Sequence, residues 1–230
     1  MPPYLPEQQL LEDVQSEART AGRSALEHAA RMGRHDVLAV LLLLRASGGG
    51  GVTTEGSVSA AQGQPDLSPA LLAAAQAGQA RCVRALLGAA AAASPLSVAE
   101  LVRARNDGGC TALMLAAGQG HAECMEALLG AAAAPPLSIA ELVRARSDGG
   151  CTALMLAAGQ GHAECVEALL GAHDPDAQAI DVDEAGGSAL FYAACWGHAR
   201  CVRLLLCHSP GAQVTASLVL SIWRGLRDEG

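Results

Sequence analysis

The fold follows from DGGCTALMLAAGQGHAECMEALLG at residues 107–130, which is written again at residues 148–171 with one letter changed, Met125 becoming Val166. The glycine within AAGQGH also has counterparts in three further segments, so it recurs at intervals of 45, 42, 41 and 36 residues. These anchor glycines are Gly33, Gly78, Gly120, Gly161 and Gly197. A segment repeated at such intervals is typical of a solenoid, in which each copy packs against the next.

Each copy has the pattern of two short helices joined by a sharp turn. A hydroxyl residue before the apolar run predicts the N-cap of the first helix, because its oxygen can accept an otherwise unpaired backbone N–H. These predicted caps are Ser24, Ser68, Thr111, Thr152 and Ser188. The anchor glycine can adopt the left-handed conformation that ends such a helix. Glu123 and Glu164 then stand in the first turn of the second helix, where the dipole favours an anion. We therefore expect an all-α fold of stacked helix pairs.

The composition supports helices and excludes several classes of function. Hydrophobic residues make up 51% of the chain but only five residues are aromatic, so alanine and leucine, both strong helix formers, must build the core. The absence of lysine excludes a Schiff base. The net charge of −8 argues against a nucleic-acid partner, and the longest aliphatic run, Val37–Leu44, is too short to span a membrane. The start lacks a signal-peptide pattern, so we expect a cytoplasmic or nuclear protein with reduced thiols.

The repeated segment resembles the ankyrin repeat family. DGGCTALMLAAGQGHAECVEALL shares the family's pattern at Asp148, Gly149, Thr152, Leu154, Ala157, Ala158, Gly161, His162, Val166, Leu169 and Leu170. The resemblance covers roughly residues 20–207, is most specific in the last three copies, and implies an α-solenoid of about five ankyrin-type helix pairs. The sequence departs from the family where Ala-Leu-Met (153–155) replaces Pro-Leu-His, and every interval exceeds the usual period of about 33 residues.

The long intervals contain connections that we expect to hold extra helices. PLSVAELVRARNDGG (95–109) and PLSIAELVRARSDGG (136–150) each carry Ser-x-x-Glu, which is a capping-box pattern. The pairs are Ser97 with Glu100, and Ser138 with Glu141. Each connection therefore predicts a short third helix that replaces most of the family's β-hairpin finger. The connection at 46–66 is rich in glycine and serine and predicts a flexible loop.

The predicted organisation has two capping helices around one ankyrin repeat domain. The N-terminal cap covers 1–20, the repeat domain 21–210 and the C-terminal cap 211–230. The units of the domain cover 21–45, 66–94, 107–134, 148–173 and 184–207, and the flexible loop separates the first two. End helices are expected because an open end of the stack would expose its core.

Histidine and cysteine recur three residues apart on the second helices, which puts them on one face and suits a metal ion or an activated thiol. The pairs are His121 with Cys124, His162 with Cys165, and His198 with Cys201. The cysteine also recurs as Cys82, where Gln79 replaces the histidine, and a feature present in nearly every copy favours a scaffold role. In the resembling family this histidine bonds between repeats and this cysteine position is buried. We therefore expect no metal, no cofactor and no catalytic residue.

The resemblance places the candidate partner-binding residues on the concave surface of the stack. They are Met32, Gln76, Gln119, Gln160 and Trp196 from the positions after the Ala-Ala pair, Cys110 and Cys151 from the position before the threonine, and Tyr192 from the last copy. Trp196 is expected either to be an exposed binding anchor or to pack on the C-terminal helix through Trp223. Cys110 and Cys151 are expected to be either inert small side chains, which the pattern favours, or accessible thiols.

These patterns favour a non-enzymatic interaction scaffold, a monomer that binds one protein partner through the concave face. Two alternatives stay open. One is a substrate adaptor of a ubiquitin ligase, with the C-terminal helix docking the ligase. The other is a metal- or redox-responsive protein that uses the His/Cys pairs or the thiols. The glutamates of the second helices predict a solvated face. Arginines at the ends of the inserted helices suit the helix dipole and are candidates for binding an acidic partner. They are Arg103, Arg105, Arg144 and Arg146.

Overall fold

The computed structural model describes residues 16, 24–46, 67–133, 137–172 and 181–208. The predicted N-terminal cap (apart from Ser16), the loop beyond Ala46 and the C-terminal cap lie outside the described residues. Within the described ranges the chain forms twelve helices and two isolated β-bridges, which confirms the all-α solenoid. The helices are α2 (Ala25–Arg31), α3 (His35–Ala46), α4 (Ser68–Gln76), α5 (Ala80–Ala93), α6 (Pro95–Arg103), α7 (Ala112–Gln119), α8 (Ala122–Ala132), α9 (Ile139–Val143), α10 (Ala153–Gln160), α11 (Ala163–Ala172), α13 (Ala189–Cys195) and α14 (Ala199–His208).

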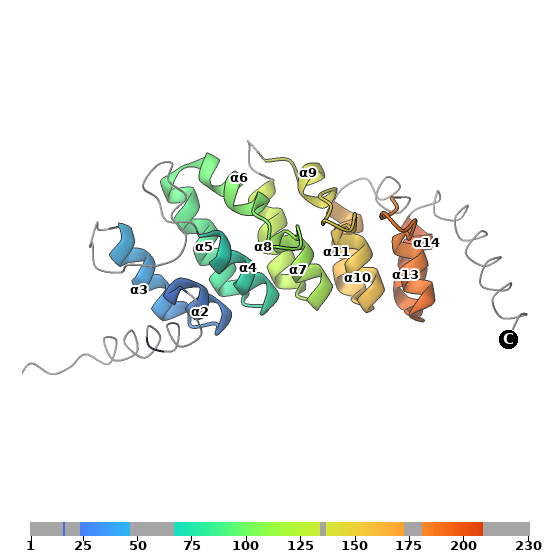
Figure 1. Cartoon of the computed structure of the whole chain (residues 1–230), viewed down its shortest axis with the longest axis horizontal. Helices are drawn as coiled ribbons and strands as arrows, with labels where there is room; N and C mark the ends of the chain where they lie inside the picture. Colours follow the sequence, from blue (N-terminus) through green and yellow to red (C-terminus); the bar gives the residue numbers. More distant parts are fainter. Residues whose placement is uncertain (1–15, 17–23, 47–66, 134–136, 173–180, 209–230) are drawn as a thin grey trace, which may run out of the picture.

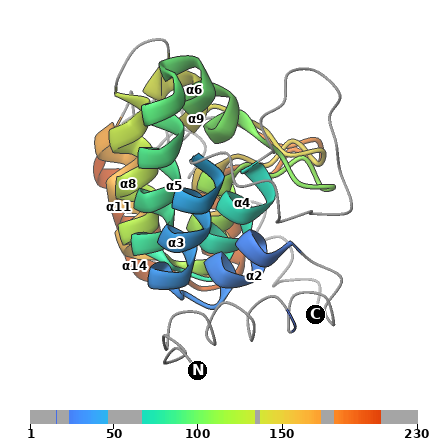
Figure 2. The ribbon, with the colours of Figure 1, turned by 90° about the vertical axis from the view of Figure 1, so that its left-hand side faces the viewer.

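The helices form two layers. The first helices of the pairs, α2, α4, α7, α10 and α13, lie side by side in one layer (Figure 1). The second helices, α3, α5, α8, α11 and α14, form the other layer, which Figure 2 shows beside the first. The extra helices α6 and α9 lie along one edge of the stack, against the second helices. Each helix pair therefore has a neighbour to supply the other half of its core.

Small residues let the first helices pack closely. The alanine pairs Ala29–Ala30, Ala74–Ala75, Ala116–Ala117 and Ala157–Ala158 are fully buried. The second helices of four pairs bury a cysteine and a leucine at equivalent positions. The cysteines are Cys82, Cys124, Cys165 and Cys201, and the leucines are Leu86, Leu128, Leu169 and Leu205. Each buried leucine contributes about 1.5–3 kcal/mol to folding relative to an exposed one. The cysteines are thus part of the core, as the scaffold interpretation predicted.

The ends of the first helices follow the predicted signals, with one exception. Gly120 and Gly161 end α7 and α10 with φ of 81° and 79°, a left-handed conformation that a residue with a Cβ rarely adopts. The caps Ser24, Thr111, Thr152 and Ser188 each accept the backbone N–H three residues on. The predicted cap at Ser68 is wrong, because α4 begins one residue earlier. The Leu71 N–H that would bond the Ser68 hydroxyl donates instead to the Leu67 carbonyl at 3.0 Å.

The two extra helices are confirmed, but their predicted capping boxes are wrong. Helix α6 begins at Pro95, and its N-cap is Ser94, whose Oγ accepts the Ser97 N–H at 3.1 Å. Ser97 therefore lies inside α6 rather than at its start. Ser138 does occupy the N-cap position of α9, without a side-chain hydrogen bond to the helix. The apolar run placed both helices correctly, whereas the serine pattern did not place their ends.

Three tight turns, here called the finger turns, lie just before α7, α10 and α13, at residues 106–110, 147–151 and 183–187. Each is closed by the N–H of its first residue, which donates to the carbonyl of its fifth residue at 2.9–3.0 Å. The side chain of each first residue also accepts backbone N–H groups of its own turn. Asn106 and Asp183 accept two each, and Ser147 accepts one. The isolated bridges lie beside the first and third turns. The hairpin of the family is thus reduced to a turn, as expected.

Candidate functional site

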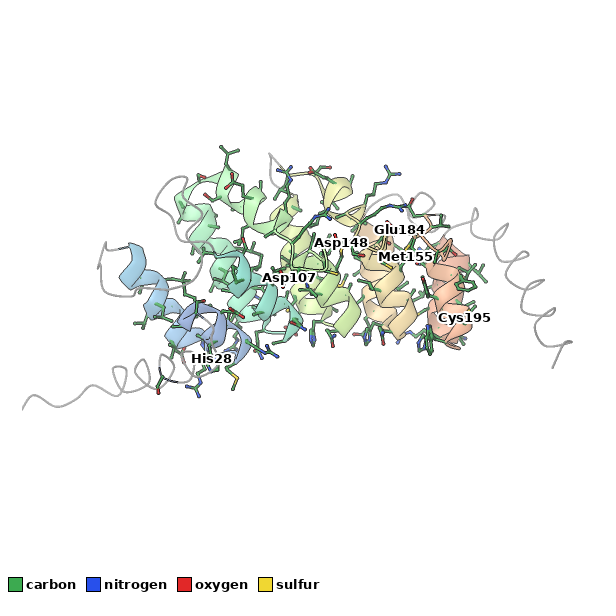
Figure 3. All side chains as sticks on the ribbon, in the orientation of Figure 1. His28, Asp107, Asp148, Met155, Glu184 and Cys195 are labelled. Atoms are coloured by element: carbon green, nitrogen blue, oxygen red, sulfur yellow. The ribbon has the colours of Figure 1, made fainter. Side chains whose placement is uncertain are left out.

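The most exposed of the predicted site residues lie at the ends of the first helices. We call the two residues before each anchor glycine the tip row, because the helices that carry them lie side by side. Its members are Arg31 and Met32, Gln76 and Ala77, Gly118 and Gln119, Gly159 and Gln160, and Cys195 and Trp196. Five of the eight predicted site residues belong to this row: Met32, Gln76, Gln119, Gln160 and Trp196, all exposed. Figure 3 labels Cys195 at this end of α13.

Trp196 is the largest exposed side chain of the tip row. Its exposed fraction is 70%, and Met32 at the opposite end of the row is 54% exposed. Large apolar side chains usually find cover in a folded protein, so two of them in one row of helix ends are a feature to explain. The alternative contact of Trp196 with Trp223 stays a prediction, because Trp223 lies outside the described residues.

Histidines of one pair fix the tip row of the preceding pair. His121 Nε2 donates to the Gln76 carbonyl at 3.3 Å, and His198 Nε2 donates to the Gly159 carbonyl at 3.0 Å. The same rings lie over anchor glycines. A Cβ at Gly78 would come within 2.6 Å of the His121 ring, and one at Gly161 within 2.5 Å of the His198 ring. The missing glycine side chain therefore makes room for the ring that aligns neighbouring helix ends.

Tyr192 lies apart from the tip row and bonds to the third finger turn. Its hydroxyl donates to Oδ2 of Asp183, and Oδ1 of the same carboxylate accepts the N–H groups of Ala185 at 2.9 Å and Gly187 at 2.7 Å. The bond to Asp183 raises the pKa of Tyr192 to about 12 and lowers the pKa of Asp183. The hydroxyl is thus engaged within the chain, and Tyr192 serves to join α13 to the finger turn.

Asp183 is a residue that the sequence analysis missed. It is 8% exposed, and besides Tyr192 it faces the Cys151 thiol, with 3.8 Å between Sγ and Oδ2. A signal for it existed, because aligning the last three copies puts Asp183 at the position of Asn106 and Ser147. All three are residues whose side chains organise tight turns.

Cys110 and Cys151 lie in the finger turns and are half-buried rather than open to solvent. Cys110 Sγ lies 3.7 Å from the Gly108 carbonyl, and Cys151 Sγ faces Asp183. Burial raises the pKa of both thiols, and the nearby carboxylates of Asp148 and Asp183 add to the effect. A raised pKa lowers the fraction of thiolate, which is the reactive form.

The His/Cys pairs of the second helices are divided between core and turn. Cys124 and Cys165 are buried, and burial raises the pKa of each to about 11. His121 at the start of α8 points instead to the preceding pair. Across the part of the chain that the structure describes, no three side chains of His, Cys, Asp or Glu gather in a way that suits a metal ion.

The arginines of the connections bridge successive pairs, which the sequence analysis did not foresee. Arg103 on α6 makes two hydrogen bonds of 2.8 Å to the Glu141 carboxylate on α9. Arg105 donates to the Arg146 carbonyl at 2.7 Å, and Arg146 donates to the Val182 carbonyl at 2.7 Å. Figure 3 shows the labelled finger-turn residues Asp107, Asp148 and Glu184 following one another along the stack. These arginines align the finger turns.

A family model described as ankyrin repeats (3 copies) matches residues 56–138 and again residues 136–217, together more than half of the chain. No curated protein matched the sequence. Among the helices described, none combines the length and the apolar character that a bilayer crossing requires. The matched residues include the second to fifth helix pairs and all three finger turns.

Proposed function

The chain belongs to the ankyrin repeat family, and on this premise we propose that it is a non-enzymatic protein that binds one partner protein along the tip row. Ankyrin repeats commonly mediate protein–protein interaction. The observation that carries the proposal is Trp196, which is 70% exposed at the end of a row of exposed helix ends. Tryptophan is among the residues that contribute most to binding at protein interfaces.

The tip row has the dimensions of an interface. Packed helices lie about 8–10 Å apart, so five helix ends in sequence extend over roughly 32–40 Å. A standard interface buries about 800 Å² and about 20–30 residues on each partner, so a partner would contact residues beside the row as well. The row is also held in place before binding, since histidine contacts align its members. A partner therefore has little ordering cost to offset.

The alternatives receive less support. Burial raises the pKa of Cys110 and Cys151, which disfavours a redox-responsive role for these thiols. The metal-responsive alternative needs ligands that converge, whereas His121 bonds the preceding pair and Cys124 lies in the core. The ubiquitin-ligase adaptor depends on residues 211–230, which lie outside the described residues, so it stays a hypothesis.

The test is a pull-down from the source cell's lysate with three forms of the chain. Wild type is compared with the row variant Trp196→Ala/Gln119→Arg/Gln160→Arg and with Leu96→Ala. Leu96 is a matched control, because it is 66% exposed on α6 and lies outside the tip row. We expect a partner that wild type and Leu96→Ala capture and the row variant loses. Equal capture by all three would place the binding site elsewhere and refute the proposal.

A further inference from the structure

The central and C-terminal part of the tip row carries no charged side chain. From the second pair to the fifth, its residues are Gln76, Ala77, Gly118, Gln119, Gly159, Gln160, Cys195 and Trp196. In a chain with 23 acidic and 15 basic residues, an uncharged stretch over four successive helix ends does not attract a charged ligand. A neutral partner segment is the electrostatic complement of this surface, because a charged one would lose its hydration there without gaining a counter-ion.

Hydrogen-bond donors are left over in this stretch. The backbone acceptors at Gln76 and Gly159 are already occupied by His121 and His198. The exposed side chains of Gln119, Gln160 and Trp196 each offer N–H donors. Each glutamine carboxamide also carries a carbonyl acceptor, whereas the Trp196 indole is a donor only. A ligand with free carbonyl acceptors can therefore bond to all three side chains.

The spacing of the row selects a backbone conformation. Neighbouring first helices pack at about 8–10 Å, so equivalent tip residues recur at that distance. A polyproline II segment presents the same face every three residues, which is about 9 Å at 3.1 Å per residue. A β-strand presents the same face about every 6.6 Å and an α-helix turns every 5.4 Å, and neither period matches the row.

We propose that the tip row from Gln119 to Trp196 binds a neutral, proline-rich segment of a partner protein in the polyproline II conformation. Trp196 packs against a proline ring, and the carboxamides of Gln160 and Gln119 donate to backbone carbonyls about three and six residues away. Proline has no backbone N–H, and a polyproline II backbone has no internal hydrogen bonds, so its carbonyls are free to accept. Aromatic side chains are the usual contact for such segments. The inference rests on the proposed function and specifies its ligand.

The test uses the full chain and fluorescein-labelled decaproline, with binding followed by fluorescence anisotropy. A Gly-Ser peptide of equal length is the flexible control. We expect saturable binding of decaproline alone, weakened at least tenfold by Trp196→Ala and at least tenfold by Gln119→Glu/Gln160→Glu. The second variant keeps the size of each side chain and removes its donors. Leu96→Ala controls for an exposed apolar residue outside the row, and Arg84→Gln controls for a change of charge on the second helices. Both should bind as wild type does.

Absent binding of decaproline, or equal binding by the row variants, overturns the inference. Circular dichroism of each variant shows whether its helices are intact, so a loss of binding by unfolding is recognised. The two proposals can also fail separately. If the pull-down partner depends on the row but decaproline does not bind, the proposed function stands and the polyproline ligand is refuted. If the partner is captured equally by the row variant, the proposed function itself is refuted.

Discussion

Helices α6 and α9 are built from almost the same residues, yet α6 spans Pro95–Arg103 and α9 only Ile139–Val143. The segments 95–130 and 136–171, to which they belong, differ at three positions. At the start of the helices the only difference is Val98 against Ile139. A change between two β-branched aliphatic residues does not account for a helix that begins three positions earlier.

The cause lies one residue upstream of the repeated segment. Ser94 precedes α6 with φ of −168°, its Oγ accepts the Ser97 N–H, and its own N–H donates to the Ala90 carbonyl at 3.0 Å. Its counterpart before α9 is Pro135. Proline has no N–H and no side-chain acceptor, and its ring holds φ near −65°. We infer that the junction residue, rather than the repeated residues themselves, determines how much of each connection is helical.

The largest expected effect comes from giving α6 the junction of α9. Ser94→Pro removes both hydrogen bonds of Ser94 and forbids its backbone angle, so we expect the free energy of unfolding to fall by about 3 kcal/mol. Urea unfolding followed by circular dichroism measures it, and the helical signal of the folded state should fall as well. An unchanged unfolding midpoint would show that the junction does not govern α6.

The third finger turn can be compared with the first two, because Asp183 occupies the position that Asn106 and Ser147 have in those turns. Tyr192→Phe removes the hydroxyl bonded to the Asp183 carboxylate and should cost about 1.5 kcal/mol at pH 7. The pKa of Asp183 is lowered in the folded state. Its contribution to the free energy of unfolding is therefore present above about pH 4 and lost as pH falls through that lowered pKa. The pKa of Tyr192 is raised to about 12, so its contribution is complete below about pH 10 and lost as pH rises through 12.

The measurement is urea unfolding of wild type and Tyr192→Phe at pH 7 and at pH 3. The difference between the two proteins should be large at pH 7 and smaller at pH 3. A pH-independent difference would mean that the variant acts through packing of the ring rather than through the carboxylate.

Replacing the junction residue before α9 by the one before α6 should lengthen α9. Pro135→Ser gives α9 the same junction residue as α6, and we expect a gain in the free energy of unfolding of about 1 kcal/mol from the new cap. The helical circular dichroism signal of the folded state should rise by the amount expected for about three more helical residues. If neither quantity changes, residues further upstream also limit α9.

The smallest expected effect concerns the contact between Arg103 on α6 and Glu141 on α9. Arg103→Gln removes the two hydrogen bonds to Glu141 on α9. Because both partners are exposed, we expect only a small fall in the free energy of unfolding in low salt and a smaller one in high salt. The twin variant Arg144→Gln changes an exposed side chain at the aligned position and should cost less. Urea unfolding in two salt concentrations compares them, and a larger effect of Arg144→Gln would contradict the assignment.

Local signals in the sequence were enough to predict most of the fold. The anchor glycines and the caps such as Thr111 and Thr152 depend on neighbours within four residues, and they lie where the pattern placed them. Ser68 failed because the Leu67 carbonyl competes for the same N–H, a choice that the pattern does not reveal. The extra helices were predicted from their apolar runs, whereas their starts depended on Ser94 and Pro135, outside the capping-box pattern.

The candidate site was predicted only in part, because its contacts join residues far apart in the chain. Repetition was enough to point to Gln119, Gln160 and Trp196, since aligned positions of a stack lie in a row. It could not reveal that Tyr192 bonds Asp183, because that pair exists only once the third finger turn lies over α13. The same holds for Arg105, whose acceptor is the carbonyl of Arg146 in the next connection.

The contact between an anchor glycine and the following pair gives the stack a direction. Gly33 lies against Gln79, Gly78 against His121, Gly120 against His162 and Gly161 against His198. In each of these contacts, the glycine of one pair packs against a histidine ring or glutamine amide of the following pair. The duplicated segment of 36 residues, 95–130, carries both halves of this contact. Tandem duplication can therefore lengthen such a gene product in whole modules, because each new copy joins its neighbours through contacts that its sequence already encodes.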